Sequence, residues 1–141
     1  MAARLNQIAS MCNSEFLARM DADDIMHPER LERQIKYLTL YPNTDVVGSS
    51  AIIIDTQNDP VNHRSATAAS NALDAARSGS FIHPTILARA SWFKNNPYSE
   101  DILRAEDYDL WLRTADYSIF RNISEPLLYY REIGISHKIN T

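Results

Sequence analysis

The sharpest change in hydropathy along the chain is a short apolar run that ends in three carboxylates. Residues 16–20 predict a buried strand, and Asp21, Asp23 and Asp24 follow it within four positions. A turn is expected there, because unpaired acidic groups do not enter a hydrophobic core. Residues 28–40 then predict a helix, with a proline near its first position. The three carboxylates are therefore expected between a strand and a helix.

The rest of the chain alternates between strand-like and helix-like patterns. Helices are predicted at 2–12, 66–78, 91–94 and 105–115, extended segments at 45–55 and 81–87, and one or two strands within 118–131. Strands interleaved with helices indicate the α/β class, here as a single domain over residues 1–141.

Three finer expectations concern burial and backbone shape. Leu31, Ile35, Leu38 and Leu40 form the apolar stripe of the 28–40 helix, Tyr108, Leu110, Trp111 and Leu112 predict a well-buried 105–115 helix, and Gly48 lies inside the 45–55 strand. The spacing of the first set is that of a helix with one face on a core. A glycine inside a strand is typical of a β-bulge.

The carboxylates lie where open α/β sheets bind ligands, at the carboxyl end of a strand. Asp21 and Asp23 flank a small residue, so in an extended segment both side chains point the same way. A divalent cation with a diphosphate would relieve their repulsion. An EF-hand is excluded, because Ile25 and Met26 occupy positions that need an oxygen ligand and glycine. A phosphoaspartyl transferase, which uses its first aspartate as nucleophile, remains open at this point.

Composition narrows the classes of function. The net charge of −4 gives no support for nucleic-acid binding. Cys12 is the single cysteine, which excludes a disulfide within the chain and suits a reducing cytoplasm. No apolar run approaches the ~20 residues of a membrane span, and Arg4, Asn6 and Gln7 interrupt any signal-peptide pattern. With three glycines in all, no glycine-rich phosphate loop is present.

A second acidic pair, Glu106 and Asp107, falls in the first turn of the 105–115 helix. Carboxylates at this position complement the helix dipole, which is a purely structural explanation. The alternative is that one of them faces a cleft and acts as a general base.

Six ordered blocks carry a resemblance to a known family. They are Asn6 with Ile8-Ala9, FLARMDADD at 16–24, PERLERQ at 28–34, FIHPT at 81–85, AEDYDLWLR at 105–113 and PLLYYR at 126–131. Together they resemble glycosyltransferase family 2, the inverting nucleotide-sugar transferases of the GT-A fold. The phosphoaspartyl alternative has no comparable set of blocks.

The resemblance implies an incomplete GT-A, Rossmann-like fold with a mixed sheet. In the family, strand–helix units that hold the nucleotide base and ribose precede the D-x-D motif. Only twenty residues precede Asp21 in this chain. We therefore expect the C-terminal metal and acceptor part of such an enzyme, without most of the nucleotide-binding half.

On the donor side, the resemblance implies a role for each acidic residue. Asp23 would bind Mn²⁺ or Mg²⁺, and Asp21 would support the metal or contact the ribose of the donor. Arg4 would approach the diphosphate, Asp24 would organise the turn, and His137 would supply a further metal or diphosphate contact.

On the acceptor side, Asp107 would be the general base, and Glu106 would help to position donor or acceptor. His83 and Trp111 would line the acceptor site. Each also has a structural alternative, His83 as a buried structural histidine and Trp111 as a core residue.

Two functions of different class follow. The first is metal-assisted transfer of a sugar from a nucleoside-diphosphate sugar to a glycan or other hydroxyl acceptor, with inversion, in polysaccharide or cell-surface glycan assembly. The second is a catalytically inactive module that self-associates as a homodimer through the uncovered edge of the 16–20 strand. A protein with either function would be cytoplasmic, and the enzyme could lie peripherally at the inner face of the membrane. Neither function involves nucleic acid or a transmembrane segment.

Overall fold

The computed structural model describes residues 1–66 and 81–133. The helix predicted at 66–78 falls, from residue 67 onward, outside the described residues, as does the tail that contains His137. The elements in chain order are α1 (Ala2–Met11), β1 (Phe16–Ala18), β2 (Ile25–Met26), α2 (Arg30–Leu40), β3 (Val46–Ile54), β4 (Pro60–Arg64), the 3₁₀ turn η1 (His83–Thr85), β5 (Leu87–Arg89), α4 (Ala90–Asn95), α5 (Glu106–Thr114) and β6 (Phe120–Arg131).

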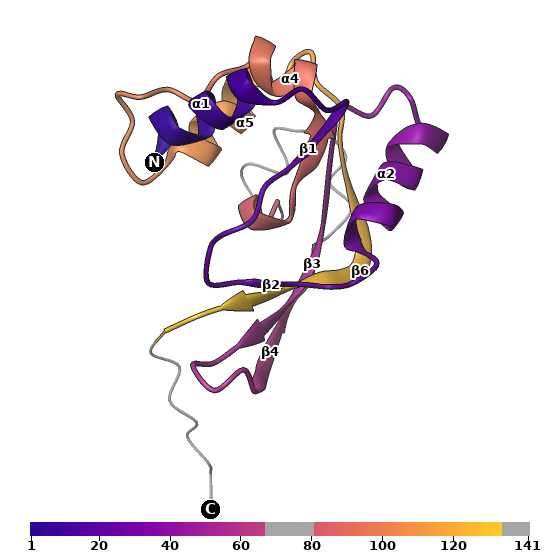
Figure 1. Ribbon diagram of the computed structural model, residues 1–141, viewed down its shortest axis with the longest axis vertical. Helices are drawn as coiled ribbons and strands as arrows, with labels where there is room; N and C mark the ends of the chain where they lie inside the picture. The colour runs from indigo at the N-terminus through magenta and orange to yellow at the C-terminus, as the bar shows by residue number, and fades with distance from the viewer. Residues whose placement is uncertain (67–80, 134–141) are drawn as a thin grey trace, which may run out of the picture.

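One mixed sheet organises these elements (Figure 1). Its strand order is β1-β5-β3-β6-β2, with β4 paired to β3 as a hairpin. The long strands β3 and β6 are parallel, whereas every other pair is antiparallel. The mixed α/β sheet that we expected is confirmed. The hairpin strand β4 and the two-residue strand β2 had no clear signal in the sequence.

Side chains of β3 and β5 alternate between two cores, as the pleat of a strand requires. Val46 and Ala88 point to the larger core, which α1, α4 and α5 complete, and Val47 and Leu87 point to the smaller core under α2. The sheet therefore has helices on both faces, and α2 stands apart from the other three (Figure 1).

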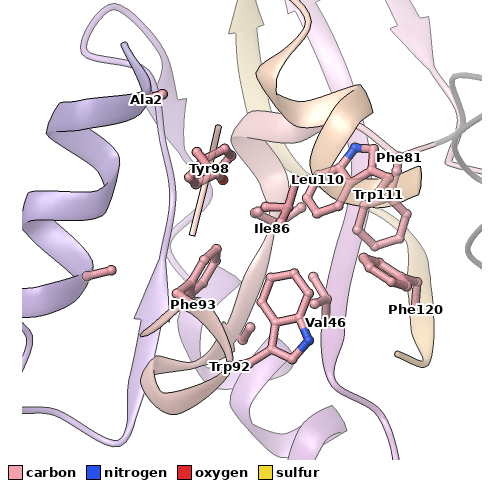
Figure 2. Packing of buried hydrophobic residues seen from close by; sticks show 12 residues of the cluster. Ala2, Val46, Phe81, Ile86, Trp92, Phe93, Tyr98, Leu110, Trp111 and Phe120 are labelled. Atoms are coloured by element: carbon pink, nitrogen blue, oxygen red, sulfur yellow. The ribbon is translucent and has the colours of Figure 1, made fainter. Parts of the chain in front are cut away.

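Aromatic rings fill the centre of the larger core (Figure 2). Phe81, Trp111 and Phe120 meet edge to face with ring centroids 5.3–5.5 Å apart. Trp92 joins them through Phe120 and donates its indole N–H to Ser118 Oγ at 2.9 Å. These contacts join α4, α5 and β6, and Trp111 holds α5 against the sheet.

The buried face of α2 differs from the stripe that the sequence predicts. Arg30, Gln34 and Leu38 are fully buried, whereas Leu31 is 39% exposed and Leu40 is 63% exposed. The buried residues Arg30, Gln34 and Leu38 are four positions apart and so share one face of the helix. Two of them are polar, so a search for apolar residues at helical spacing does not find this face. The same limit applies to α5, where Leu110 and Trp111 are buried but Tyr108 and Leu112 are exposed.

Backbone carbonyls explain the two buried polar residues of α2. Arg30 Nη2 donates to the carbonyls of Arg19, at 2.7 Å, and Ile86, at 3.3 Å. Its Nε donates to Gln34 Oε1 at 2.9 Å, and Gln34 Nε2 donates to the carbonyls of Val47 and Thr85. The pair thus ties the end of β1, the η1–β5 segment and β3 to one helix.

Gly48 lies at a close approach of two strands. A Cβ at this position would lie 2.5 Å from Asn122 Oδ1 on the neighbouring strand β6. The register shifts between β3 and β6 come after it, between Ser49 and Ala51, so the predicted bulge at Gly48 is wrong by one or two residues. Despite these shifts, residues 118–131 form one strand and not two, β6 from Phe120 to Arg131.

The strand expected at 16–20 is shorter and more exposed than predicted. It forms β1, Phe16–Ala18, whose three residues are half-buried, and among the described residues β1 pairs only with β5. The reason is its place at one edge of the sheet. Residues 81–87, expected to be extended, contain the turn η1 before β5 begins. Within 1–66 and 81–133, no helix has the length and apolar character needed to cross a bilayer.

The buried guanidinium of Arg30 predicts a large effect on stability. Arg30→Met keeps a similar volume but removes charged hydrogen bonds to the carbonyls of Arg19 and Ile86, next to β1 and β5, and we expect it to lower the free energy of unfolding by about 3 kcal/mol. Arg33→Met is the matched control on the same helix, because Arg33 is exposed and pairs with Glu29, an interaction worth at most about 1 kcal/mol. Urea denaturation followed by circular dichroism measures both, and equal midpoints would contradict the structural role of Arg30.

Candidate functional site

The three carboxylates form a turn that is fixed at both ends by strands. Asp21–Asp24 connects β1 to β2, and β2 pairs with the end of β6. Arg131, the last residue of β6, donates its backbone N–H to Asp24 Oδ1 and its Nε to the carbonyl of Asp23, both at 2.9 Å. The turn is therefore at the carboxyl ends of β1 and β6, the edge at which we expected a ligand.

The carboxylates differ in what surrounds them. Asp23 is exposed. Asp21 is partly exposed, and its Oδ1 forms an ion pair with Arg19 Nη2 at 2.8 Å. Asp24 is buried, and this burial raises the pKa of its carboxyl despite the opposing hydrogen bond from the Arg131 N–H; the charges of Asp21 and Asp23 raise it further by smaller amounts. Asp24 thus builds the turn, while Asp21 and Asp23 remain accessible to a ligand.

This donor set fits a cation that is shared with phosphate oxygens. Within the described residues, no group of three or more histidine, cysteine, aspartate or glutamate side chains is arranged to hold a metal. Mg²⁺ and Mn²⁺ commonly bind through one or two carboxylates and complete their coordination with water and substrate phosphates. Two accessible carboxylates, Asp23 and Asp21, meet that requirement.

Arg19 links the carboxylate turn to the rest of the site. It is 8% exposed, and its Nε and Nη1 have no hydrogen-bond partner among the described residues. It lines a cavity of about 100 Å³ between α1 and β1, together with Ile8, Met20 and Tyr98. A buried guanidinium with unpaired donors next to an open carboxylate is suited to an anionic ligand group.

A second cluster surrounds the imidazole of His83. Its Nε2 is 2.8 Å from the hydroxyl of Tyr98, and its Nδ1 is 4.0 Å from Asp107 Oδ2. Burial, assisted by the nearby charge of Arg19, lowers the pKa of His83 to about 3, so the ring is neutral at neutral pH. Burial also raises the pKa of Tyr98, which keeps its hydroxyl protonated.

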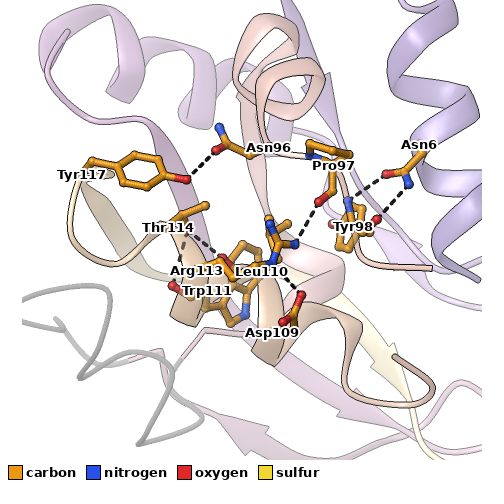
Figure 3. A network of polar contacts seen from close by, with 10 residues as sticks. All are labelled: Asn6, Asn96, Pro97, Tyr98, Asp109, Leu110, Trp111, Arg113, Thr114 and Tyr117. Atoms are coloured by element: carbon orange, nitrogen blue, oxygen red, sulfur yellow. Dashed lines mark hydrogen bonds and ion pairs between the residues drawn. The ribbon is translucent and has the colours of Figure 1, made fainter. Parts of the chain in front are cut away.

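The loop that carries Tyr98 is held from two sides (Figure 3). Asn6 of α1 accepts the N–H of Tyr98 at 2.8 Å and donates to its carbonyl at 2.9 Å. On the other side, Arg113 of α5 donates to the carbonyl of Pro97 at 2.9 Å and pairs with Asp109 at 2.7 Å. These bonds fix Tyr98 relative to α5, and hence relative to Asp107.

The structure places the remaining candidates as follows. Glu106 and Asp107 begin α5 and are both partly exposed, so either is accessible from outside. Trp111 is 3% exposed and packs behind His83 with ring centroids 5.8 Å apart, so it presents no open face to a ligand. Arg4 is exposed on α1 and bonds to Gln7. The guanidinium that pairs with a carboxylate of the turn is that of Arg19, which pairs with Asp21.

Three residues of the site had no role assigned from the sequence: Arg19 and Tyr98, which line the cavity, and Asn6, which binds the backbone of Tyr98. Arg131 was a candidate for the diphosphate from the sequence, but its hydrogen bonds hold the carboxylate turn. For Arg19 a signal was available, because an arginine inside an apolar run must find buried partners. For Asn6 and Tyr98 the contact spans ninety-two positions of sequence, which no local pattern reveals.

A sequence model of a protein family, described as "Glycosyl transferase family 2", matches residues 1–124. Two curated relatives illustrate the similarity. EpsE of Bacillus subtilis, whose name describes it as a glycosyltransferase, is 32% identical over 94% of this chain and 49% of its own length. The O-antigen biosynthesis glycosyltransferase WbnJ of Escherichia coli is 31% identical over 90% of this chain and 51% of its own length. The chain thus spans about half the length of the relatives it matches.

Solved structures agree on the fold. Residues of TarS from S. aureus superpose on 89% of this chain with a TM-score of 0.67, at 16% sequence identity, and represent 38% of that TarS chain. The likeness supports the partial GT-A architecture that we expected, a mixed sheet with only part of the fold present.

Proposed function

Since the chain belongs to glycosyl transferase family 2, we propose that it supplies the metal-binding and acceptor part of an enzyme that transfers a sugar from a nucleoside-diphosphate sugar to a hydroxyl group. The observation that carries this proposal is the position of Arg19. Its guanidinium pairs with Asp21 of the carboxylate turn, and its charge acts on His83 and Tyr98 beside Asp107. The donor-side carboxylates and the candidate base therefore belong to one electrostatic site.

On the donor side, Asp23 would bind Mn²⁺ or Mg²⁺, and Asp21 would support the ion or contact the ribose. A bound cation would supply electrostatic stabilisation of the diphosphate leaving group. Arg19 would place its positive charge near the diphosphate, because its Nη2 already pairs with Asp21 of the turn, whereas Arg4 is exposed and bonds to Gln7. Asp24 and Arg131 would keep the turn in shape without touching the donor.

On the acceptor side, Asp107 would remove the proton of the attacking hydroxyl. The hydroxyl oxygen forms a bond to the anomeric carbon as the bond from that carbon to the diphosphate breaks on the opposite face, and the configuration inverts. Glu106 would position donor or acceptor. The partial exposure of Asp107 gives an acceptor access to its carboxylate.

The name of the relative WbnJ supports a glycan as the acceptor class, since it describes O-antigen biosynthesis. We extend the proposal to polysaccharide or cell-surface glycan assembly in the cytoplasm, with a peripheral place at the inner face of the membrane. The single cysteine of the chain suits that compartment.

A second candidate function rests on the edge of the sheet. β1 has one neighbour among the described residues, and beside it Ile8 and Met11 of α1 are more than half exposed. An unpaired apolar edge of this kind favours association with another chain. In this alternative the chain is a non-catalytic module that forms a two-fold dimer through β1 and α1, and by itself transfers no sugar.

The metal proposal predicts that Asp23→Ala weakens Mn²⁺ binding about tenfold or more, because one of two accessible carboxylates is lost. Asp116→Ala, at an exposed position beyond α5, is the control and leaves the affinity unchanged. Calorimetric titration of each variant with Mn²⁺, in the presence and absence of a nucleoside diphosphate, measures the effect. The same affinity in Asp23→Ala as in the original chain would remove this residue from the metal site.

The base proposal predicts that Asp107→Asn lowers kcat about 10²-fold or more in a complete enzyme that carries this sequence, with little change in donor affinity. Asp116→Asn is the control, because Asp116 is exposed beyond the end of α5 and has no part in the site. Steady-state kinetics with saturating donor separate the two effects. If Asp107→Asn changes only the KM for the acceptor, Glu106 becomes the candidate base.

The dimer proposal predicts that Ile8→Lys weakens self-association of the isolated chain about tenfold or more, because the lysine charge would be buried against the partner. Leu40→Lys is the control, because Leu40 is 63% exposed at the end of α2, far along the chain from α1 and β1. Sedimentation equilibrium measures both variants. A chain that stays monomeric at high concentration would rule out this candidate function.

A further inference from the structure

The ring of His83 is held so that its two nitrogens face different groups. Tyr98 and Trp111 pack against the imidazole, with ring centroids 5.5 and 5.8 Å away. Tyr98 is itself fixed by two hydrogen bonds to Asn6. In this orientation Nε2 meets the Tyr98 hydroxyl and Nδ1 faces the Asp107 carboxylate.

These neighbours select one tautomer of the neutral ring. A proton on Nε2 would leave a lone pair on Nδ1 that faces the negative charge of Asp107. A proton on Nδ1 removes that repulsion, and Nε2 then accepts a hydrogen bond from the Tyr98 hydroxyl. This hydroxyl stays protonated, because burial and the charges of Asp107 and Glu106 disfavour its anion. Arg19, the other charged group that acts on the ring, opposes a second proton. The neutral tautomer with Nδ1–H is therefore favoured.

The distance between Nδ1 and Asp107 fits a third atom between them. At 4.0 Å the two atoms are too far apart for a direct hydrogen bond. Two hydrogen bonds of ~2.8 Å that meet at a single oxygen, at an angle of roughly 90°, span this separation. An alcohol oxygen suits the position, because it can accept one hydrogen bond and donate another.

We propose that His83 is a positioning residue for the acceptor: its Nδ1–H donates to the attacking hydroxyl oxygen, whose own proton then points to Asp107. Tyr98 holds His83 in this state through Nε2. One lone pair of the hydroxyl oxygen is engaged by Nδ1–H, the proton is directed to the base, and the second lone pair is left for the anomeric carbon. This inference rests on the proposed function and adds to it the orientation of the nucleophile.

The arrangement also restricts the class of acceptor. An alcohol has the lone pair that Nδ1–H requires, whereas an ammonium group has no lone pair and cannot accept from it. A neutral His83 cannot switch to an acceptor at Nδ1 without changing tautomer and losing the hydrogen bond from Tyr98. The site therefore selects hydroxyl over protonated amine acceptors.

Nitrogen NMR of the isotope-labelled chain tests the tautomer without any need for activity. We expect His83 to carry its proton on Nδ1 near neutral pH, and Asp107→Asn to shift the ring toward the Nε2–H form, because the negative charge that disfavours a lone pair on Nδ1 is gone. His83→Asn identifies the His83 signals by their loss. A ring protonated on Nε2 in the original chain would overturn the proposal, whatever the function of the chain.

Two substitutions of His83 in a complete enzyme test the positioning role. His83→Asn keeps an N–H donor near the place of Nδ1, and His83→Gln keeps one near Nε2. We expect His83→Gln to lower kcat about 10²-fold and His83→Asn to recover at least tenfold of that loss, provided that both unfold at the same temperature as the original protein. Equal losses in the two variants, with matching stability, would overturn the proposal.

The outcome is separable from that of the proposed function. If Asp107→Asn abolishes turnover while the two His83 variants are alike, Asp107 remains the base and only the positioning role is lost. If Asp107→Asn keeps its turnover, the assignment of Asp107 as the base fails, whatever the two His83 variants show. Where either His83 variant unfolds at lower temperature, Tyr98→Phe provides the kinetic test instead, and full kcat in Tyr98→Phe counts against the proposal.

Discussion

The buried pair Arg30 and Gln34 is the interaction on which the rest of the structure depends. The two side chains donate to carbonyls of Arg19, Ile86, Val47 and Thr85, which belong to three separate segments of the sheet region. Burial lowers the pKa of Arg30 to about 10, which reflects the free energy needed to bring a charge into the core, although Asp24 offsets part of it. An arginine without a carboxylate in contact is accommodated here because two backbone carbonyls and Gln34 Oε1 accept hydrogen bonds from its Nη2 and Nε, although its Nη1 has no partner among the described residues.

This pair also explains why the donor side and the acceptor side keep a fixed relation. Arg30 binds the carbonyl of Arg19, whose side chain pairs with Asp21, while Gln34 binds the carbonyl of Thr85 in the turn that begins with His83. The carboxylate turn and the His83 cluster are therefore attached to adjacent turns of one helix. A change that loosened α2 would alter both at once, even though no residue of α2 enters the site.

The parts of the structure that the sequence predicts are those set by local patterns. The order of helices and strands, the carboxylates after β1 and the acidic start of α5 all follow from hydropathy and spacing within a few residues. The buried face of α2 does not, since the partners of Arg30 and Gln34 are carbonyls that carry no mark in the sequence. Strand β2 was missed because two residues, Ile25 and Met26, form it only by pairing with the distant end of β6.

The roles within the site divide in the same way. Asp21, Asp23, Asp107 and His83 could be proposed from motif and resemblance, because their chemistry is visible in the residue type. Tyr98 and Asn6 could not, because their effect on His83 comes from contacts between α1, η1 and a loop that are far apart in the sequence.

The unequal burial of the carboxylates gives the turn both rigidity and an open face. Arg131 binds the side chain of Asp24 and the backbone, not the side chain, of Asp23. Its remaining donors bind Asn58 and the carbonyl of Asp55 at the end of β3, so the ends of β3 and β6 are joined at the turn. These bonds leave the Asp23 carboxylate exposed. The side chain best placed to bind a cation is therefore not needed to hold the turn together. The opposite arrangement, with Asp23 buried and Asp24 exposed, would require a ligand to break the turn in order to bind.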